Sequence, residues 1–489
     1  MKLRVRYRPR GKYRFQKFFK LSKEFRVLAP VTRRTVEVAK AFGLGIDEEK
    51  VFSIFKDFEV EIKPGDIVYV TGESGGGKTT LLYMLVDEMC RHKEFQPIIT
   101  DNNIRIRKNQ LVIHGIGRTF QEALEILNYT GLNDAFIFLR RFRELSDGQK
   151  YRYKLAKALS RNVKTLIFDE FCATLDRETA KIVAYLIQKI CRKKGVTLIV
   201  ATTHEDLIED VNPNILIRKG LGPEVKVEYF KHEPKECSVL KDFVIEEGSI
   251  EDLRSLEFWH YKGEFKGWRS TIYHARIGDK TIGVVVYVYP HIYLKARFNT
   301  LPHLKEIHER SRRDYLDYIN RCFRRLARII VHPKYRGIGL AVRIVRKTMS
   351  LLNVPYVECV AVMPRYNPFL KHAGMIEVKV EPSRILEHIY MTLEKMGFNL
   401  DMIQSRKYNL RILKTMKKQD LKKLQKIILR MYNPKFKKDV KLVKKITRGD
   451  VEAMADALKK TPIPTTYYIW KNPLFKDHPD PVNQDSQRN

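Results

Sequence analysis

The stretch Gly72-Glu73-Ser74-Gly75-Gly76-Gly77-Lys78-Thr79 decides how the first half of this 489-residue chain folds. A short apolar run, 67–70, precedes it and predicts a strand, and a helical pattern, 79–90, follows it. Glycines between a strand and a helix let successive backbone N–H groups surround an anion at the helix N-terminus. The stretch therefore predicts a phosphate-binding loop.

Two side chains of this loop have specific roles in holding a nucleotide. The amine of Lys78 reaches the β- and γ-phosphates of ATP, and the hydroxyl of Thr79 binds Mg²⁺. The predicted nucleotide-binding residues of the loop are Gly72, Glu73, Ser74, Gly75, Gly76, Gly77, Lys78, Thr79 and Thr80.

Two carboxylates end a second apolar run, 165–168. We expect Asp169 to complete the Mg²⁺ site with Thr79, and Glu170 to polarise the attacking water. Further apolar runs alternate with helical patterns from 66 to 218, which predicts a buried parallel sheet of α/β type. The motif Leu145-Ser146-Asp147-Gly148-Gln149 lies one helix upstream of the carboxylates, and His204 follows the next strand.

In this order the motifs resemble those of the ABC ATPase family across residues 66–210, with 145–149 as the signature and 173–176 as the D-loop. The resemblance implies that Ser146 and Gly148, assigned to the site together with Gln149, cap the γ-phosphate of ATP held by a second copy. It implies that His204, which we count among the catalytic residues, contacts that phosphate. With one such set of motifs in the chain, the resemblance also implies a homodimer with two ATP molecules at its interface.

Two features depart from the family pattern. Asp147 replaces the commoner glycine of the signature, which adds a negative charge near the phosphate. Only a short segment separates Lys78 from the signature, and no glutamine is clearly placed as the Q-loop, for which Gln110 and Gln121 are the candidates. Because the apolar runs are also too short to span a bilayer, a transporter role is disfavoured and a cytoplasmic location is expected.

A second glycine-rich turn lies between a strand and a helix at 331–341. It resembles the R-x-x-G-x-A element of GNAT acetyltransferases, in the frame of residues 240–380. The resemblance implies acetyl-CoA bound by Val331, Arg336, Gly337, Ile338, Gly339, Leu340 and Ala341, with Asn367 nearby. Transfer needs a base and an acid, for which Glu358 and Tyr366 are the candidates. A glycine-rich turn without a ligand is the alternative.

The charge balance points to a large anionic partner. Lys and Arg number 93 against 57 Asp and Glu, a formal net charge of +36. Basic residues crowd 406–430 and alternate along 2–14, where aromatic residues are interleaved, a mixture that favours RNA over duplex DNA. Solvated basic faces and an anionic membrane are the alternatives. Six scattered cysteines indicate reduced structural thiols.

The expected fold is a P-loop ABC ATPase domain of α/β class, followed by an α+β GNAT domain and a basic helical tail. The expected segments are a basic appendage at 1–50, the ATPase at 51–235, the GNAT domain at 236–382, the helical region at 383–472 and a disordered tail at 473–489. This order resembles archaeal fusions of an ABC-type ATPase with a predicted acetyltransferase. Three functions stay open: ATP-dependent acetylation of RNA, possibly tRNA; acetylation of protein regulated by dimerisation; and a nucleic-acid-bound ATPase with a non-catalytic GNAT fold.

Overall fold

The computed structural model forms two compact units. The first unit consists of Met1–Val286 with Arg328–Thr348, and the second of Tyr287–Ala327 with Met349–Asn489. The residues that the structure describes are 4–5, 18–27, 30–45, 50–260, 271–362, 367–379, 384–431, 440–461 and 465–475.

A six-stranded sheet forms the centre of the first unit, in the order β5-β6-β7-β4-β8-β9. Its first five strands are parallel, and β9 runs antiparallel to β8 at the edge. The strands are β4 (Ile67–Gly72), β5 (Ile98–Thr100), β6 (Thr165–Phe168), β7 (Thr197–Ala201), β8 (Ile215–Lys219) and β9 (Val225–Tyr229). The predicted parallel sheet is confirmed.

Both faces of the central part of this sheet are covered, which explains why β4, β6 and β7 are mostly apolar and buried. Successive residues of a strand point to opposite faces. Tyr69, Leu166 and Leu198 pack in one core with α3 (Phe120–Tyr129), α5 (Asp147–Leu159) and α6 (Arg177–Lys194). Val68, Ile167 and Ile199 pack in a second core with α2 (Lys78–Met89) and with strands of a smaller sheet.

That smaller sheet is antiparallel and has the order β1-β2-β3. Its strands are β1 (Arg4–Val5), β2 (Phe18–Val27) and β3 (Lys50–Glu61). Phe19 and Leu21 of β2 are fully buried in the second core, so the segment predicted as a basic appendage contributes a core strand. The helix that follows β2 in the chain is α1 (Arg33–Phe42), capped by Thr32. Most of the alternating arginines lie outside the described residues.

A second, mixed sheet contributes strands to each unit, and β12 and β13 have residues in both. The first unit holds the order β10-β11-β12-β13, and the second unit holds β13-β14-β16-β15. Its strands are β10 (Val244–Glu247), β11 (Thr271–Ile277), β12 (Lys280–Val288), β13 (Phe323–Val331), β14 (Tyr356–Ala361), β15 (Ile376–Val378) and β16 (Thr466–Lys471). Strands β11 and β12 are neighbours joined by a short turn at Gly278, which has a positive φ.

Strand β16 was not expected, because it lies in the segment assigned to the helical region. It pairs with β14 along its whole length, from Tyr356 opposite Lys471 to Ala361 opposite Thr466, and with β15 on its other side. Tyr467, Tyr468 and Ile469 are buried there. The chain therefore leaves this sheet after β15 and returns to it after the helices.

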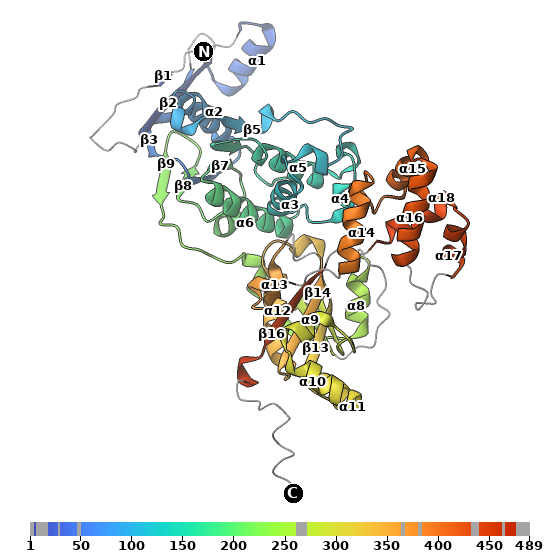
Figure 1. Cartoon of the computed structure of the whole chain (residues 1–489). Coiled ribbons are helices and arrows are strands. Elements are labelled where there is room, and N and C mark those ends of the chain that lie inside the picture. The colour runs from blue at the N-terminus through green and yellow to red at the C-terminus, as the bar shows by residue number, and fades with distance from the viewer. Residues whose placement is uncertain are drawn as a thin grey trace. The chain divides into compact units, whose positions relative to one another are not determined.

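The helices between β15 and β16 gather in one bundle (Figure 1). They are α14 (Arg384–Lys395), α15 (Arg406–Thr415), α16 (Lys418–Met431), α17 (Val440–Thr447) and α18 (Val451–Lys459). Leu413, Leu424, Ile446 and Leu458 are fully or almost fully buried in their common core. Helices α15 and α16 are separate, because the backbone of Met416 between them is extended.

The remaining α-helices of the described residues lie between the strands along the chain. They are α4 (Ala135–Phe138), α7 (Ile208–Val211), α8 (Ile250–Glu257), α9 (Lys295–Thr300), α10 (His303–Arg310), α11 (Arg312–Cys322), α12 (Leu340–Leu351) and α13 (Phe369–His372).

A fully buried ion pair anchors the second unit. Arg297 of α9 donates from Nε and Nη2 to the two carboxylate oxygens of Glu358 on β14, at 3.0 and 2.7 Å, and neither side chain has exposed surface. Tyr315 accepts from Arg297 at 2.9 Å, and Tyr467 of β16 donates to Glu358 at 3.1 Å. Burial lowers the pKa of Arg297, but the bonds to Glu358 outweigh it, so that this pKa is raised.

We predict that Arg297→Met destabilises the second unit by about 3–5 kcal/mol, because it leaves the Glu358 carboxylate buried without a cation. Urea unfolding followed by circular dichroism measures the change. Lys305→Met is the matched control, since Lys305 and Glu309 form an exposed pair at 3.6 Å, and we expect less than about 1 kcal/mol. The double variant Arg297→Met/Glu358→Leu should recover part of the loss. Equal effects of Arg297→Met and the control would contradict a stabilising role of the pair.

Candidate functional site

The loop 72–79 joins β4 to α2, as the sequence predicts, and two of its glycines are required by close packing. Gly72 has a φ of +135°, and a Cβ there would lie 1.9 Å from the carbonyl oxygen of Lys219. Gly77, the N-cap of α2, has a φ of +97°, and a Cβ there would lie 2.6 Å from Ile54 Cγ2. The backbone can therefore curl tightly at the start of α2, where the first-turn amides have no partner within the helix.

The amine of Lys78 is folded over this loop. It donates to the carbonyl oxygens of Gly72 at 2.9 Å and Glu73 at 2.7 Å. Burial lowers the pKa of Lys78, and the nearby carboxylate of Asp169 opposes that effect. The amine of Lys78 thus lies against the loop that leads into the first-turn amides of α2, and a cation together with such amides is a donor set suited to phosphate.

A hydroxyl and a carboxylate meet beside the loop. Thr79 Oγ1 donates to Asp169 Oδ2 at 2.5 Å, and Asp169 Oδ1 accepts from the Glu170 amide at 3.0 Å. These oxygens suit a hard divalent cation, so Thr79 and Asp169 fit the predicted Mg²⁺ site. Glu170 is exposed and has a φ of +47°, a conformation that non-glycine residues adopt rarely.

The structure adds Asp101, which the sequence pattern did not single out. Asp101 directly follows β5, the strand that pairs in parallel with β6, and the carboxyl ends of parallel strands meet at one edge. Burial raises the pKa of Asp101, and the charge of Asp169 raises it further. Strand β5 has only three residues, which is too short for a reliable pattern.

Neither predicted Q-loop candidate follows a strand of the six-stranded sheet. Gln110 donates to the carbonyl oxygen of His114 at 3.0 Å, and Gln121 lies in α3. The residue that directly follows β5 is Asp101, a carboxylate and not a glutamine.

The signature segment forms the N-terminus of α5 and touches the D-loop. Ser146 and Gln149 cap each other's backbone amides, at 3.4 and 3.1 Å. A Cβ on Gly148 would lie 3.1 Å from Leu175 Cδ2. Asp147 pairs with Lys150 at 3.0 Å, which offsets the extra negative charge noted in the sequence.

His204 follows β7 at the same edge of the sheet as Asp169 follows β6. Its backbone is held at two points, because Tyr69 donates to its carbonyl oxygen and its amide donates to Thr202 Oγ1. The ring is partly exposed.

The second glycine-rich turn, 331–341, has the expected strand and helix on either side, β13 and α12. Gly337 and Gly339 have φ values of +87° and +92°. The guanidinium of Arg336 is turned inward, and burial lowers its pKa. It donates to the carbonyl oxygens of Asn133 at 2.7 Å, Val331 at 2.8 Å and Trp259 at 3.3 Å. Arg336 therefore holds the turn in place, and backbone amides are the groups left to meet an anion.

The acid–base pair predicted for acetyl transfer requires a correction at Glu358. Its carboxylate is enclosed in the ion pair with Arg297, which removes it from any substrate. Tyr366 lies outside the described residues. Asn367 is exposed, and its carbonyl oxygen accepts from the Phe369 amide at 2.8 Å just before α13.

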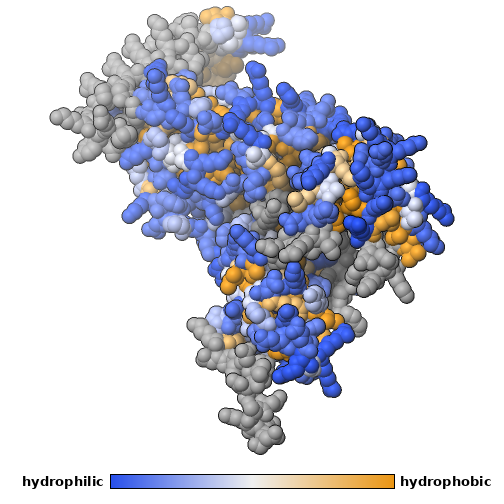
Figure 2. Space-filling view, in the orientation of Figure 1, coloured by the Kyte–Doolittle hydropathy of each residue, from blue (hydrophilic) through white to orange (hydrophobic). Residues whose placement is uncertain are grey.

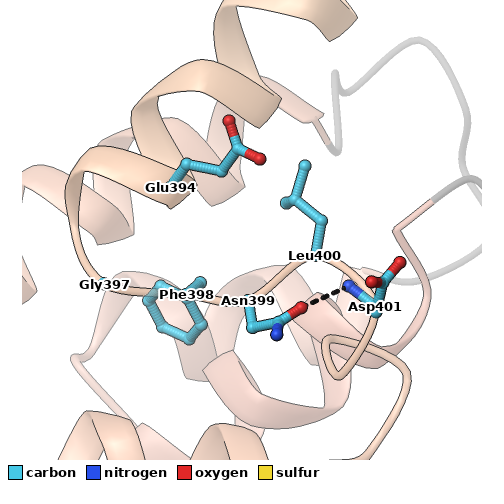
Figure 3. Close-up of a pocket in the computed structure, with 6 residues that line it drawn as sticks. All are labelled: Glu394, Gly397, Phe398, Asn399, Leu400 and Asp401. Carbon is cyan, nitrogen blue, oxygen red and sulfur yellow. Dashed lines mark hydrogen bonds between the residues drawn. The ribbon is translucent and has the colours of Figure 1, made fainter. Parts of the chain in front are cut away.

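A hollow of about 580 Å³ lies beside the segment that joins α14 to α15, and no predicted site residue lines it (Figure 3). It is lined by Glu394, Gly397, Phe398, Asn399, Leu400 and Asp401. Asn399 Oδ1 accepts from the Asp401 amide at 2.9 Å. It is open to solvent, and we assign it no function.

All six cysteines are free, as expected for structural thiols. Burial raises the pKa of both Cys191 and Cys237 to about 12, so these thiols stay protonated at neutral pH.

The chain is similar to the ATP-binding proteins of known transporters over about a third of its length. It is 26% identical to the methionine import ATP-binding protein MetN of Clostridioides difficile, covering 34% of this chain and 61% of that protein. It is 29% identical to MetN of Clostridium tetani, covering 36% of this chain and 65% of that protein. The leukotoxin translocation ATP-binding protein LktB of Mannheimia glucosida is 27% identical, with 34% of this chain and 28% of that protein covered.

About a third of this chain is thus an ABC-type nucleotide-binding domain. No family model matches the chain. The dimeric bacterial ABC transporter cassette MJ0796 aligns with a TM-score of 0.30 and 17% identity, covering 38% of this chain and 94% of that one. The chain spans only about three fifths of the length of the first MetN relative. Within the described residues, no helix is both long enough and apolar enough to cross a bilayer.

Proposed function

We propose that the chain is an ATP-hydrolysing ABC-type machine that works as a homodimer. The observation that carries this proposal is the contact of Thr79 with Asp169, beside Glu170 and the Lys78 loop. Separate parts of the chain supply the phosphate-binding loop, the candidate metal-binding oxygens and an exposed carboxylate. The described residues contain one set of these groups. The signature at Ser146 to Gln149 would therefore act on ATP bound by a second copy of the chain.

In this proposal Lys78 and the amides of the loop bind the phosphates of ATP. Thr79 and Asp169 would hold Mg²⁺, which would act there as a Lewis acid and neutralise charge on the β- and γ-phosphates. Glu170 orients and deprotonates the attacking water, for which its exposed carboxylate is suited. His204 and the partner's signature hold the γ-phosphate.

We predict that Glu170→Gln lowers ATP turnover at least about a hundredfold while ATP still binds, because the amide keeps the shape but not the basicity of the carboxylate. Released phosphate measures turnover, and sedimentation measures a dimer that accumulates with ATP. Glu205→Gln is the matched control, since Glu205 is an exposed carboxylate after β7 that pairs with Arg218. Parental turnover in Glu170→Gln would remove Glu170 from this role.

For the α+β part, we propose acetyl-CoA as the ligand of the 331–341 turn and RNA as the acetyl acceptor. Two glycines with positive φ precede the first-turn amides of α12, an arrangement suited to a pyrophosphate.

We predict that labelled acetyl-CoA, incubated with the protein, ATP and total RNA or protein, places label in a fraction that nuclease removes. Gly339→Glu should abolish this labelling, because it adds a negative charge to the turn. Gly222→Glu is the matched control, since Gly222 also has a positive φ, +86°, and open space around its Cα. Label that only protease removes would favour protein acetylation, and label in neither fraction would favour the non-catalytic GNAT fold, which the burial of Glu358 also favours.

Helices α15–α18 of the bundle form the surface that we propose for RNA. Hydrophilic side chains cover much of the visible face of this bundle (Figure 2). Arg406 is bound to Glu452 and Asp456, at 2.8 and 2.7 Å. The cations that give the bundle its positive charge are Lys407, Arg411, Lys414, Lys417, Lys418, Lys422, Lys423, Lys426, Arg430, Lys441, Lys444, Lys445 and Arg448.

We predict that the affinity for bulk tRNA falls steeply as the salt concentration rises. The double variant Lys422→Ala/Lys426→Ala should make the slope of log K against log salt shallower by about 1–2. The two lysines lie one turn apart on α16. Filter binding between about 50 and 200 mM salt measures the slope. Lys226→Ala/Lys231→Ala, at exposed lysines outside the bundle, should leave it unchanged. A shallow salt dependence in the parental protein would exclude phosphate contacts as its source of affinity.

A further inference from the structure

The turn between β13 and α12, which contains a 3₁₀ turn at Pro333–Tyr335, is bound to the D-loop of the nucleotide-binding domain within the first unit. Lys334 Nζ lies 2.6 Å from Asp176 Oδ1 and 2.6 Å from Glu178 Oε2. Lys334 is only 20% exposed. Burial lowers the pKa of Lys334, but the two carboxylates outweigh it and raise this pKa, so the amine stays charged.

Two neighbours of Lys334 extend this contact. The Tyr335 hydroxyl donates to Glu178 Oε1 at 2.6 Å, on the first turn of α6. The Arg336 guanidinium donates to the carbonyl oxygen of Asn133 at 2.7 Å, and Asn133 Nδ2 donates back to the carbonyl oxygen of Arg336 at 3.0 Å. Three consecutive side chains from outside the 66–210 segment therefore bind to it.

Hydrogen bonds of one arginine connect the segment around Asn133 to the signature. Arg152 of α5 donates to the carbonyl oxygen of Gly131 at 2.8 Å, two residues before Asn133, and to that of Gly148 at 3.2 Å. Gly148 in turn faces Leu175 of the D-loop. The D-loop and the signature, the segment expected to face a second copy, are thus supported by the same turn.

The D-loop begins shortly after the carboxylate proposed to activate water. Glu170 and Cys172 have φ values of +47° and +60°, conformations that cost side-chain-bearing residues about 1 kcal/mol or more each. The Cys172 amide donates to the Tyr151 hydroxyl at 2.8 Å, which fixes one part of the segment. Asp176, which caps α6 through Thr179, fixes the other end, and Lys334 holds Asp176.

We propose that Lys334 is a positioning residue for ATP hydrolysis: by holding Asp176 and Glu178 it fixes the 170–176 segment, and with it the carboxylate of Glu170. This inference rests on the proposed hydrolysis of ATP. It assigns to the GNAT-like turn a role in the nucleotide reaction, whether or not that turn also binds a ligand of its own.

Lys334→Met tests the proposal, because methionine keeps most of the aliphatic stem and removes the charge. We expect kcat for ATP to fall about three- to tenfold with KM unchanged, since Lys78 and Thr79 are untouched. Lys334→Arg, which can still reach both carboxylates, should stay within about twofold of the parental kcat. Lys347→Met on α12, at an exposed lysine, is the matched control. Parental kcat in Lys334→Met, or an equal loss in Lys347→Met, would overturn the proposal.

Hydrogen–deuterium exchange of the nucleotide-free protein gives a readout that needs no turnover. Lys334→Met should raise the exchange of amides in the 170–180 segment severalfold, while Lys347→Met and Lys334→Arg leave it unchanged. Unchanged exchange in Lys334→Met would overturn the positioning role by itself. A parental protein without ATP turnover would contradict the proposed function instead, and the exchange measurement would still decide whether Lys334 orders the D-loop.

Discussion

The parallel arrangement of β5, β6, β7 and β4 is the constraint on which the nucleotide site depends, because the loops after parallel strands all lie at one edge of a sheet. Asp101, Asp169 and His204 directly follow strands or lie a few residues beyond them, and the phosphate-binding loop follows β4. This sheet keeps its geometry because both faces are closed, one by helices and the other by α2 and a small antiparallel sheet. A buried strand at 18–27, in a basic part of the chain, is therefore part of the support of the site.

The second unit is held together differently, by charge as well as by apolar packing. A bidentate guanidinium–carboxylate pair without exposed surface links α9 to β14, and two tyrosine hydroxyls complete its hydrogen bonding. Such pairs stabilise only when every group in them is satisfied. The position of Glu358, on the strand that follows a glycine-rich turn in the chain, suggests a catalytic role. In the structure its carboxylate instead forms the buried ion pair with Arg297.

The sequence alone predicts the structure where a conformation depends on residues adjacent in the chain. It does not predict contacts between residues far apart in the chain. Gly72 to Thr79 and the run ending at Asp169 predict their own conformations, because a strand, a turn and a helix each depend on adjacent residues. Asp101 was missed since its strand has three residues, and β16 was missed since it returns to its sheet after five helices. The contacts of Arg297 with Glu358 and of Lys334 with Asp176 join residues far apart in sequence, and no single sequence reveals such pairings.

The return of β16 makes the helical bundle a removable insertion. Its two ends are attached to antiparallel neighbours, β15 and β16, whose register places Val378 opposite Tyr467. Antiparallel strands can be joined by a turn of about two residues, so a short hairpin could replace all five helices without breaking the ladder to β14. The bundle is in this sense a module mounted on one sheet at two adjacent points, and it can be exchanged or lost without altering the order of the strands.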